Sequence, residues 1–421
     1  PGFYALCPDD FTGVTPKVVV KEQEYVMAGG PLFIDKNHPE VQFVSPVSGV
    51  VTSVERGARR KVLSITVEAA QEQDYEEFGK EDVSKMDAVS VKAALLKSGM
   101  FAFIKQRPYD IVADPTVAPR AIFVSAFDTN PLAPDFELAL KGEEANFQTG
   151  LDALAKIAKT YLSISVNQKA AALTQAKNVT LTVFDGPHPA GNVGVQINNI
   201  APINKGETVW TIDPQAVIFI GRLFNTGHVD LTRLVAVTGS EVKKPSYCKL
   251  KVGALLTNVF AGNVSTDKNL RYISGNVLTG KQITANGFLG AFHSQVTVIP
   301  EGDDVHEMLG WIMPRFDQFS TSHSYFSWLM GKKEYTLDAR VKGGERHMIM
   351  SNEYDRVLPM DIMPEYLIKA IIAGDIDRME ALGIYEVAPE DFALCEFVCS
   401  SKMELQRIVR EGLDMLRREM C

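Results

Sequence analysis

Short apolar segments separated by glycine and proline dominate the first 70 residues. β-Branched residues gather in five runs, at 18–20, 32–34, 41–44, 50–54 and 62–67. Each run has the length of a strand and is bounded by turn residues, a pattern typical of small barrels. We therefore predict small-barrel strands over 14–68 and place a first domain at 1–70.

Acidic and polar residues between 69 and 90 indicate a linker, after which the hydrophobic pattern changes period. Ser90 is predicted to cap a helix that reaches Leu96 and ends at Gly99. Strand and helix signals then alternate: strand 121–126, helix within 136–158, strands 161–166 and 179–184, helix 214–223 and strand 234–238. The strands are largely apolar and β-branched, as parallel strands buried on both faces tend to be. A Rossmann-like α/β domain is predicted for 71–244, although no Gly-x-Gly-x-x-Gly opens any of its helices.

The sequence pattern changes twice after residue 244. Residues 245–300 again show short strands and turns and are predicted to form a β-grasp (SLBB-like) insert. An aromatic-rich connecting segment follows at 301–351, in which residues 316–328 form either a partner-facing patch or core.

Helix signals fill 352–421. They are Pro364 before 366–372, Asp375 before a short helix stopped by Gly383, Pro389 before 390–398, and a Ser401/Glu404 capping box. The final helix carries an apolar stripe at Leu405, Ile408, Val409, Leu413 and Leu416. We predict a C-terminal helical bundle, so the fold class is α/β multidomain.

Composition excludes several functions. A net charge of −9 without a Lys/Arg block disfavours nucleic-acid binding. The most apolar stretch, 209–224, is interrupted by Asp213 and Arg222, so we expect no membrane span. Five scattered cysteines indicate a reducing compartment, and we expect a cytoplasmic location. The chain begins at Pro1 without Met, from which we expect a trimmed N-terminus.

The loop 184–194 carries three glycines, two prolines and His188. Gly186 and Gly191 have the spacing of a P-loop, but Asn192 stands where its lysine would be, and the prolines remove two amides. A rigid surface loop that places His188 or meets a partner is therefore favoured over a phosphate cradle.

Other polar constellations have two interpretations each. Arg222 and His228 lie in a glycine-bounded segment that could bind an anion, but a helix terminus meeting a sheet is favoured. Cys395 and Cys399 are spaced to share a helix face, but two thiols are too few for an iron–sulfur cluster, so buried packing is favoured. The histidines form no metal-binding pair; they are residues 38, 188, 228, 293, 306, 323 and 347. No metal site is predicted.

Residues 24–36 followed by 45–51 resemble the hybrid barrel of biotinyl and lipoyl carrier domains. Lys36, after Asp35, would then stand near the modified lysine. Residues 37–40 lengthen the hairpin where carriers keep a tight turn, so a solvated lysine in a structural barrel is favoured over lipoylation.

Longer peptides carry a more specific resemblance over nearly the whole chain. The chain is similar to the A subunits of the sodium-translocating NADH:quinone oxidoreductases at 125–133, 184–191, 208–212, 220–224, 273–275, 354–361 and 394–399. The order of domains also resembles the flavin-bearing subunit of complex I and the C subunit of the Rnf complex.

The resemblance implies a peripheral subunit on the cytoplasmic face of the bacterial inner membrane, docked on the B subunit of a six-subunit complex. That complex passes electrons from NADH through flavins and iron–sulfur clusters to quinone and exports Na⁺. Where the cousins hold FMN, this chain has bulky residues at 98–107, so we expect it to carry no cofactor and no catalytic residue. The alternative is an FMN or iron–sulfur electron-entry subunit like the Rnf C subunit, or a flavoprotein dehydrogenase acting alone.

The candidate partner or quinone-site loops are those of Asp185, His188 and Arg222. The expected tasks of the chain are assembly and support of the quinone-reduction site. A direct contact with quinone, at the interface with the B subunit, is left open by the residues.

Overall fold

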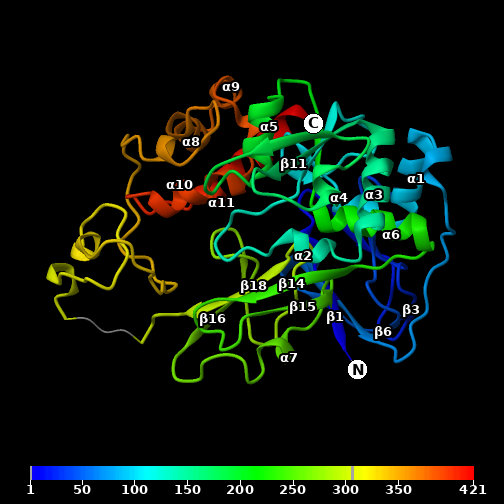
Figure 1. Ribbon diagram of the computed structural model, residues 1–421, viewed down its shortest axis with the longest axis horizontal. Coiled ribbons are helices and arrows are strands. Elements are labelled where there is room, and N and C mark those ends of the chain that lie inside the picture. The colour runs from blue at the N-terminus through cyan, green and yellow to red at the C-terminus, as the bar shows by residue number, and fades with distance from the viewer. Residues whose placement is uncertain (1, 305–307) are drawn as a thin grey trace.

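The N-terminal strands form two small antiparallel sheets around one apolar core. The computed structural model describes residues 2–304 and 308–421 (Figure 1); Pro1 and His306, both named above, lie outside them. One sheet has the order β1-β7-β6-β3 and the other β2-β4-β5. Their strands are β1 (Phe3–Leu6), β2 (Pro16–Val18), β3 (Tyr25–Val26), β4 (Pro31–Asp35), β5 (Gln42–Val44), β6 (Gly49–Arg56) and β7 (Val62–Ala69). Phe33 on β4 and Phe43 on β5 form a buried cross-strand pair whose rings stack with centroids 4.4 Å apart. The predicted strands at 32–34, 41–44, 50–54 and 62–67 are confirmed, whereas the run at 18–20 overlaps β2 only at Val18, and β1 and β3 were not predicted.

Residues 70–86 lead to the first helix, α1 (Ala88–Ser98). The predicted N-cap is wrong: Asp87 caps the helix and accepts a 2.8 Å hydrogen bond from the Ser90 amide. A short 3₁₀ turn, η3 (Val83–Lys85), precedes it. Gly99 ends α1 in the left-handed conformation, as predicted, with φ of 79°.

The central sheet has the order β12-β11-β10-β13-β8-β9. Its parallel strands are β10 (Ala121–Ser125), β11 (Lys159–Ser165), β12 (Thr180–Phe184) and β13 (Val209–Ile212), and the antiparallel edge is β8 (Lys105–Arg107) and β9 (Ile111–Val112). This is the strand order of an open doubly wound sheet, so the Rossmann-like prediction is confirmed. Strand β13 was not predicted. The assignment of 234–238 to this sheet is wrong, because that strand pairs elsewhere.

Helices cover both faces of the central sheet. They are α2 (Phe136–Leu140), α3 (Glu144–Ile157), α4 (Ala171–Thr174), α5 (Val193–Ile200) and α6 (Pro214–Thr226). Helices α3 and α6 approach closely because glycines stand where they meet. A Cβ at Gly150 would collide with Val217, and one at Gly221 would collide with the Asn146 backbone. Helix α5 packs on the other side, where Phe123, Ile197 and Val209 share a small core.

A mixed sheet of order β15-β14-β18-β16-β17 follows. Its strands are β14 (Thr232–Thr238), β15 (Ser246–Lys251), β16 (Leu270–Ser274), β17 (Lys281–Ile283) and β18 (Gln295–Pro300), with α7 (Thr257–Phe260) against it. Strand β14 pairs in parallel with β18 and antiparallel with β15. The chain therefore leaves the central sheet after α6 and enters the next sheet directly.

The C-terminal helices bury a separate apolar core that lies beside the central sheet in Figure 1. They are α8 (Pro364–Ala373), α9 (Ile376–Ala381), α10 (Ala393–Val398) and α11 (Leu405–Met420), with 3₁₀ turns η7 (Tyr354–Arg356), η8 (Ile384–Glu386) and η9 (Pro389–Phe392). The predicted stripe of α11 is buried. The predicted capping box is wrong, because α11 starts at Leu405 and Ser401 instead donates to the His347 carbonyl.

Residues 308–350 connect the mixed sheet to these helices with little regular structure. They contain only short 3₁₀ turns among the described residues, η5 (Gly310–Ile312) and η6 (Phe326–Met330). In Figure 1 this yellow segment extends at the left, away from the sheets.

Candidate functional sites

The loop between β12 and α5 crosses the carboxyl end of β10. Ser125, the last residue of β10, donates its hydroxyl to the Gly191 carbonyl at 2.9 Å. Gln196 on α5 then donates to the Ser125 hydroxyl at 2.8 Å and to the Ala190 carbonyl at 3.1 Å. Open α/β sheets bind ligands at the carboxyl ends of their strands where the strand order reverses, here between β10 and β13. The loop therefore fills the part of that crevice next to β10.

The amides of this loop have acceptors within the protein. The Gly191 amide donates to Thr129 Oγ1 at 3.0 Å. The amides of Ala190 and Asn192 donate to the carbonyls of the two loop prolines, each at 2.9 Å. A Cβ at Gly191 would lie 2.7 Å from the Thr129 amide nitrogen, so only glycine allows this contact. The geometry opposes a phosphate cradle, in agreement with the sequence.

His188 is held by the loop that follows β10. Its Nδ1 lies 2.9 Å from Thr129 Oγ1, and because that oxygen accepts from the Gly191 amide, its own proton is available for the imidazole. Burial lowers the pKa of His188, while Asp128 acts in the opposite direction. The lowered pKa favours the neutral imidazole, and the contact with Thr129 holds its ring in place. Asp185 is exposed at the start of the same loop.

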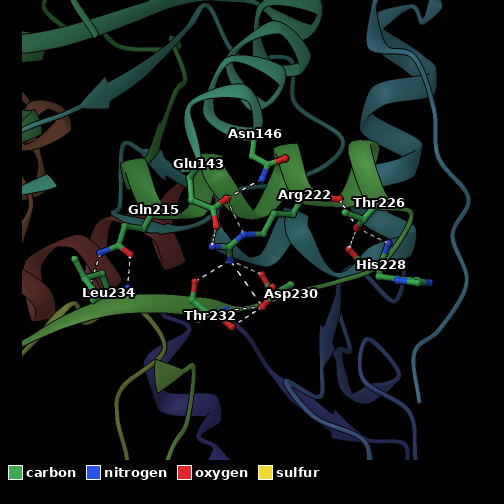
Figure 2. A network of polar contacts seen from close by, with 9 residues as sticks. All are labelled: Glu143, Asn146, Gln215, Arg222, Thr226, His228, Asp230, Thr232 and Leu234. Atoms are coloured by element: carbon green, nitrogen blue, oxygen red, sulfur yellow. Dashed lines mark hydrogen bonds and ion pairs between the residues drawn. The ribbon is translucent and has the colours of Figure 1, made fainter. Parts of the chain in front are cut away.

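Arg222 lies in a different network, on α6 (Figure 2). Its Nε and Nη2 donate to the two carboxylate oxygens of Glu143, at 3.2 and 2.8 Å. Its Nη1 donates to the carbonyls of Asp230 and Thr232, at 3.1 and 2.8 Å. Burial disfavours the charged form of Glu143, but the hydrogen bonds from Arg222 and Asn146 outweigh it and lower its pKa. The guanidinium is used to join α3, α6 and β14, which fits the structural interpretation rather than an anion site.

A small polar cavity of about 160 Å³ adjoins this network. Its lining includes Lys141, Glu143, Arg222 and Arg233. Arg233 is fully buried and pairs with Asp213 at 2.7 Å. Both arginines that line the cavity already have protein carboxylates, so a water-filled space suits it.

Further contacts attach α6 to the neighbouring strand (Figure 2). Gln215 and the backbone of Leu234 exchange two hydrogen bonds of 2.9 Å. His228 Nε2 lies 2.7 Å from Glu77, beyond the end of α6. Helix α6 is thereby fixed to β14, the first strand of the mixed sheet along the chain. Arg222 bonds to neither Asp185 nor His188 in the described structure, so the three candidates do not form one site.

A buried ion pair that no sequence pattern indicated connects the central sheet to the C-terminal helices. Arg107 at the end of β8 lies 2.9 Å from Asp391 and 3.2 Å from Glu390, and its side chain is 1% exposed. Arg107 also donates to the Glu386 carbonyl at 3.1 Å. A Cβ at Gly194, in the first turn of α5, would collide with both Arg107 and Asp391. The chain's own carboxylate therefore lies at the start of α5, where a helix favours an anion.

Cys395 and Cys399 are both buried, as the sequence favoured. Cys399 Sγ lies 2.8 Å from the Tyr354 hydroxyl, and Cys395 Sγ contacts the Tyr354 carbonyl at 3.9 Å. Burial raises the thiol pKa of Cys395 well above its ordinary value. No group of three or more metal-ligating side chains occurs in the described parts of the chain, residues 2–304 and 308–421. A protonated thiol in an apolar core is a poor metal ligand.

Lys36 stands in the turn after β4, with its side chain exposed. Asp35 beside it is buried and accepts from the amides of Thr15 and Asn37, at 3.3 and 3.1 Å. The turn is thus fixed by Asp35, and modification of Lys36 stays an untested alternative.

The fold defines a class: a multidomain α/β protein that combines a barrel-sandwich hybrid, a Rossmann-like unit and an SLBB-like sheet. Three family models match in that order. They are the NqrA N-terminal barrel-sandwich hybrid domain at residues 1–70, the NqrA second alpha/beta domain at 86–229 and the NQRA C-terminal domain at 234–285.

Full-length relatives agree with the family models. The chain is 36% identical over 420 residues to the A subunit of the Na(+)-translocating NADH-quinone reductase of Yersinia pestis bv. Antiqua (strain Angola), covering 99% of this chain and 93% of the relative. It is 37% identical, with the same coverage, to the A subunit from Neisseria meningitidis serogroup A / serotype 4A (strain DSM 15465 / Z2491). The chain belongs to the NqrA family, the A subunits of the Na(+)-translocating NADH-quinone reductases. Among its described helices, none is both long and apolar enough to cross a membrane.

Proposed function

We propose that this chain is a peripheral subunit on the cytoplasmic face of the sodium-pumping NADH:quinone reductase and carries no redox group itself. It supports assembly and the quinone-reduction site next to the membrane-embedded B subunit. The electrons pass through cofactors of other subunits. A C-terminal helical bundle completes the scaffold.

The observation that carries this proposal is the use of the Rossmann-like crevice by the chain's own residues. The loop 185–192 lies over the end of β10 with its amides at 190–192 bonded internally. FMN phosphate needs such amides to be available at a loop or helix terminus. The Asp391 carboxylate lies against Gly194 in the first turn of α5 and occupies the space beside that turn.

The segment 98–107, which corresponds to the FMN-holding loop of the flavin-bearing relatives, also supports a chain without flavin. Residues 100–104 are buried, and the ring of Phe101 meets Trp210 edge-on at a centroid distance of 5.4 Å. The segment then continues into Arg107, which is committed to Asp391. Residues that pack into the core cannot open a cradle around a cofactor without losing that burial.

An absorption spectrum with flavin and iron analysis of the purified chain tests the cofactor proposal. We expect no stoichiometric flavin or iron. Bound FMN or a cluster would instead identify an electron-entry subunit like the Rnf C subunit.

The quinone role is tested in the whole complex with Asp185→Asn and His188→Gln. We expect a raised KM for quinone and unchanged NADH oxidation by an artificial acceptor, because the early electron carriers are elsewhere. Asp377→Asn, which changes an exposed carboxylate on α9, is the matched control. Quinone kinetics identical to those of the wild type would remove Asp185 and His188 from the quinone site.

A further inference from the structure

The turn η6 exposes apolar side chains almost continuously. Phe326, Trp328, Leu329 and Met330 are 50%, 53%, 60% and 54% exposed, while Ser327 between them is buried. Isolated exposed apolar residues are normal on soluble proteins, but contiguous ones mark an interaction surface. We call residues 326–333 the apolar turn.

The apolar turn is held in place by its surroundings. The Phe326 amide donates to the Pro314 carbonyl at 2.9 Å, and the Tyr335 hydroxyl donates to the Ser327 carbonyl at 3.5 Å. His323 stacks on Trp328 with ring centroids 5.9 Å apart. These contacts fix Ser327 inward and direct its apolar neighbours outward. In Figure 1 the yellow segment that contains the turn projects from one end of the molecule.

The charge of this region differs from that of the whole chain. Exposed Lys332 and Lys333 follow the apolar residues after Gly331. Residues 308–350 contain six Lys or Arg and four Asp or Glu, a net charge of +2 in a chain of −9. Aromatic and aliphatic side chains followed by lysines fit the boundary between lipid headgroups and acyl chains.

The positive charge of residues 308–350 also favours lipid over protein as the binding partner of the apolar turn. Anionic lipids attract a basic segment, whereas the cytoplasmic loops of membrane proteins carry an excess of Lys and Arg and would repel it. We propose that the apolar turn inserts into the interfacial zone of an anionic bilayer, with Lys332 and Lys333 at the level of the headgroups. The proposal concerns how the chain meets a membrane and does not depend on its cofactor content.

Vesicle flotation of the full chain tests this proposal. The probes are vesicles of phosphatidylcholine alone and of phosphatidylcholine with phosphatidylglycerol. We expect the wild type to float with the anionic vesicles and W328S/L329S to bind them at least tenfold more weakly. K332S/K333S should lose about fivefold per lysine. The matched control is Y366S/I372S, which removes two equally exposed apolar side chains from α8 and should bind within twofold of wild type.

A second readout does not depend on a disruptive variant. Brominated lipid in the anionic vesicles should quench tryptophan fluorescence of the wild type, and W328F should lose that quenching. The proposal is overturned if the wild type binds neither vesicle, or if W328S/L329S binds as the wild type does. It is also overturned if W328S/L329S retains vesicle binding but no longer copurifies with the membrane subunits in detergent, because a protein would then be the occupant. A flavin found on the purified chain would overturn the proposed function and leave this result unaffected.

Discussion

The junction around Arg107 and the apolar turn at 326–333 use side chains in opposite ways. At the junction, the ionisable side chains of Arg107 and Asp391 are almost fully buried, and they join elements 284 residues apart in sequence. In the apolar turn, Trp328 and Leu329 are more than half exposed. A buried charge needs its partner to remain buried, so the junction fixes how two parts of the fold are placed. Exposed apolar residues contribute little to the fold and remain available for binding.

Removal of one charge at the junction should have the largest effect. Asp391→Ala leaves the Arg107 guanidinium buried without its nearest partner and removes the acceptor of the Ala388 amide. We expect the free energy of unfolding to fall by about 3–5 kcal/mol in chemical denaturation. Glu390→Gln is the control, because the Glu390 side chain is 42% exposed and its loss should cost below about 1 kcal/mol. A loss for Asp391→Ala no larger than that of the control would contradict the role given to the junction.

Another buried arginine, Arg222 on α6, tests whether the same rule holds away from the junction. Arg222→Met removes the paired bonds to Glu143 and the bonds to two carbonyls, so we expect a loss of about 2–3 kcal/mol. Arg222→Lys keeps the charge but lacks the planar fork, and its stability should be intermediate. An Arg222→Lys variant as stable as the wild type in urea denaturation would show that the fork geometry has no importance here.

A partly buried histidine, His293, extends the comparison to pH. Burial, with the nearby cations Lys105, Arg233 and Lys281, lowers the pKa of His293 to about 4. The unfolded chain then binds a proton below its ordinary pKa of about 6.5 that the folded chain does not, so stability falls as pH drops from there to about 4. At about pH 5 this contribution should be about 2 kcal/mol. His293→Gln should reduce the slope of unfolding free energy against pH, and an unchanged slope would refute the assignment.

The smallest effect is expected where apolar residues are removed from the surface. W328S/L329S should change the free energy of unfolding by less than about 0.5 kcal/mol, because these side chains are exposed in the folded chain. We expect the thermal unfolding curve of W328S/L329S to match that of the wild type, whereas Asp391→Ala should be strongly destabilised. A destabilisation near about 2 kcal/mol would show that the apolar turn packs into the fold in solution.

Local chemistry explains which elements could be predicted. The strands of the barrel, the cap at Asp375 and the stripe of α11 follow from residue type and period alone, and the structure contains them. The cap of α1 was misplaced because Asp87 and Ser90 are both good cap residues within one turn. Strand β14 was assigned to the wrong sheet because an apolar run predicts a strand but says nothing about its neighbours.

The candidate sites also divide into features that local sequence predicted and features set by contacts between distant residues. The loop 184–194 stood out by its glycines and prolines, and the absence of a P-loop lysine already opposed a phosphate cradle. Its fold against Thr129 and Ser125 could not be foreseen, since these residues lie 62 and 66 positions before Gly191. No local signal distinguished Arg107 or Asp391 from surface residues, because burial of a charge depends on the element that covers it.

The sequence by itself determined the order of domains and the NqrA family. It also determined the helices and strands whose pattern is local, because period and turn chemistry act over a few residues. Only the tertiary structure decided which carboxylate meets which arginine, which amides are used within the loop after β12, and which apolar residues remain outside. Those outcomes depend on contacts between residues distant in sequence, where burial sets the free energy of each charge and hydrogen bond.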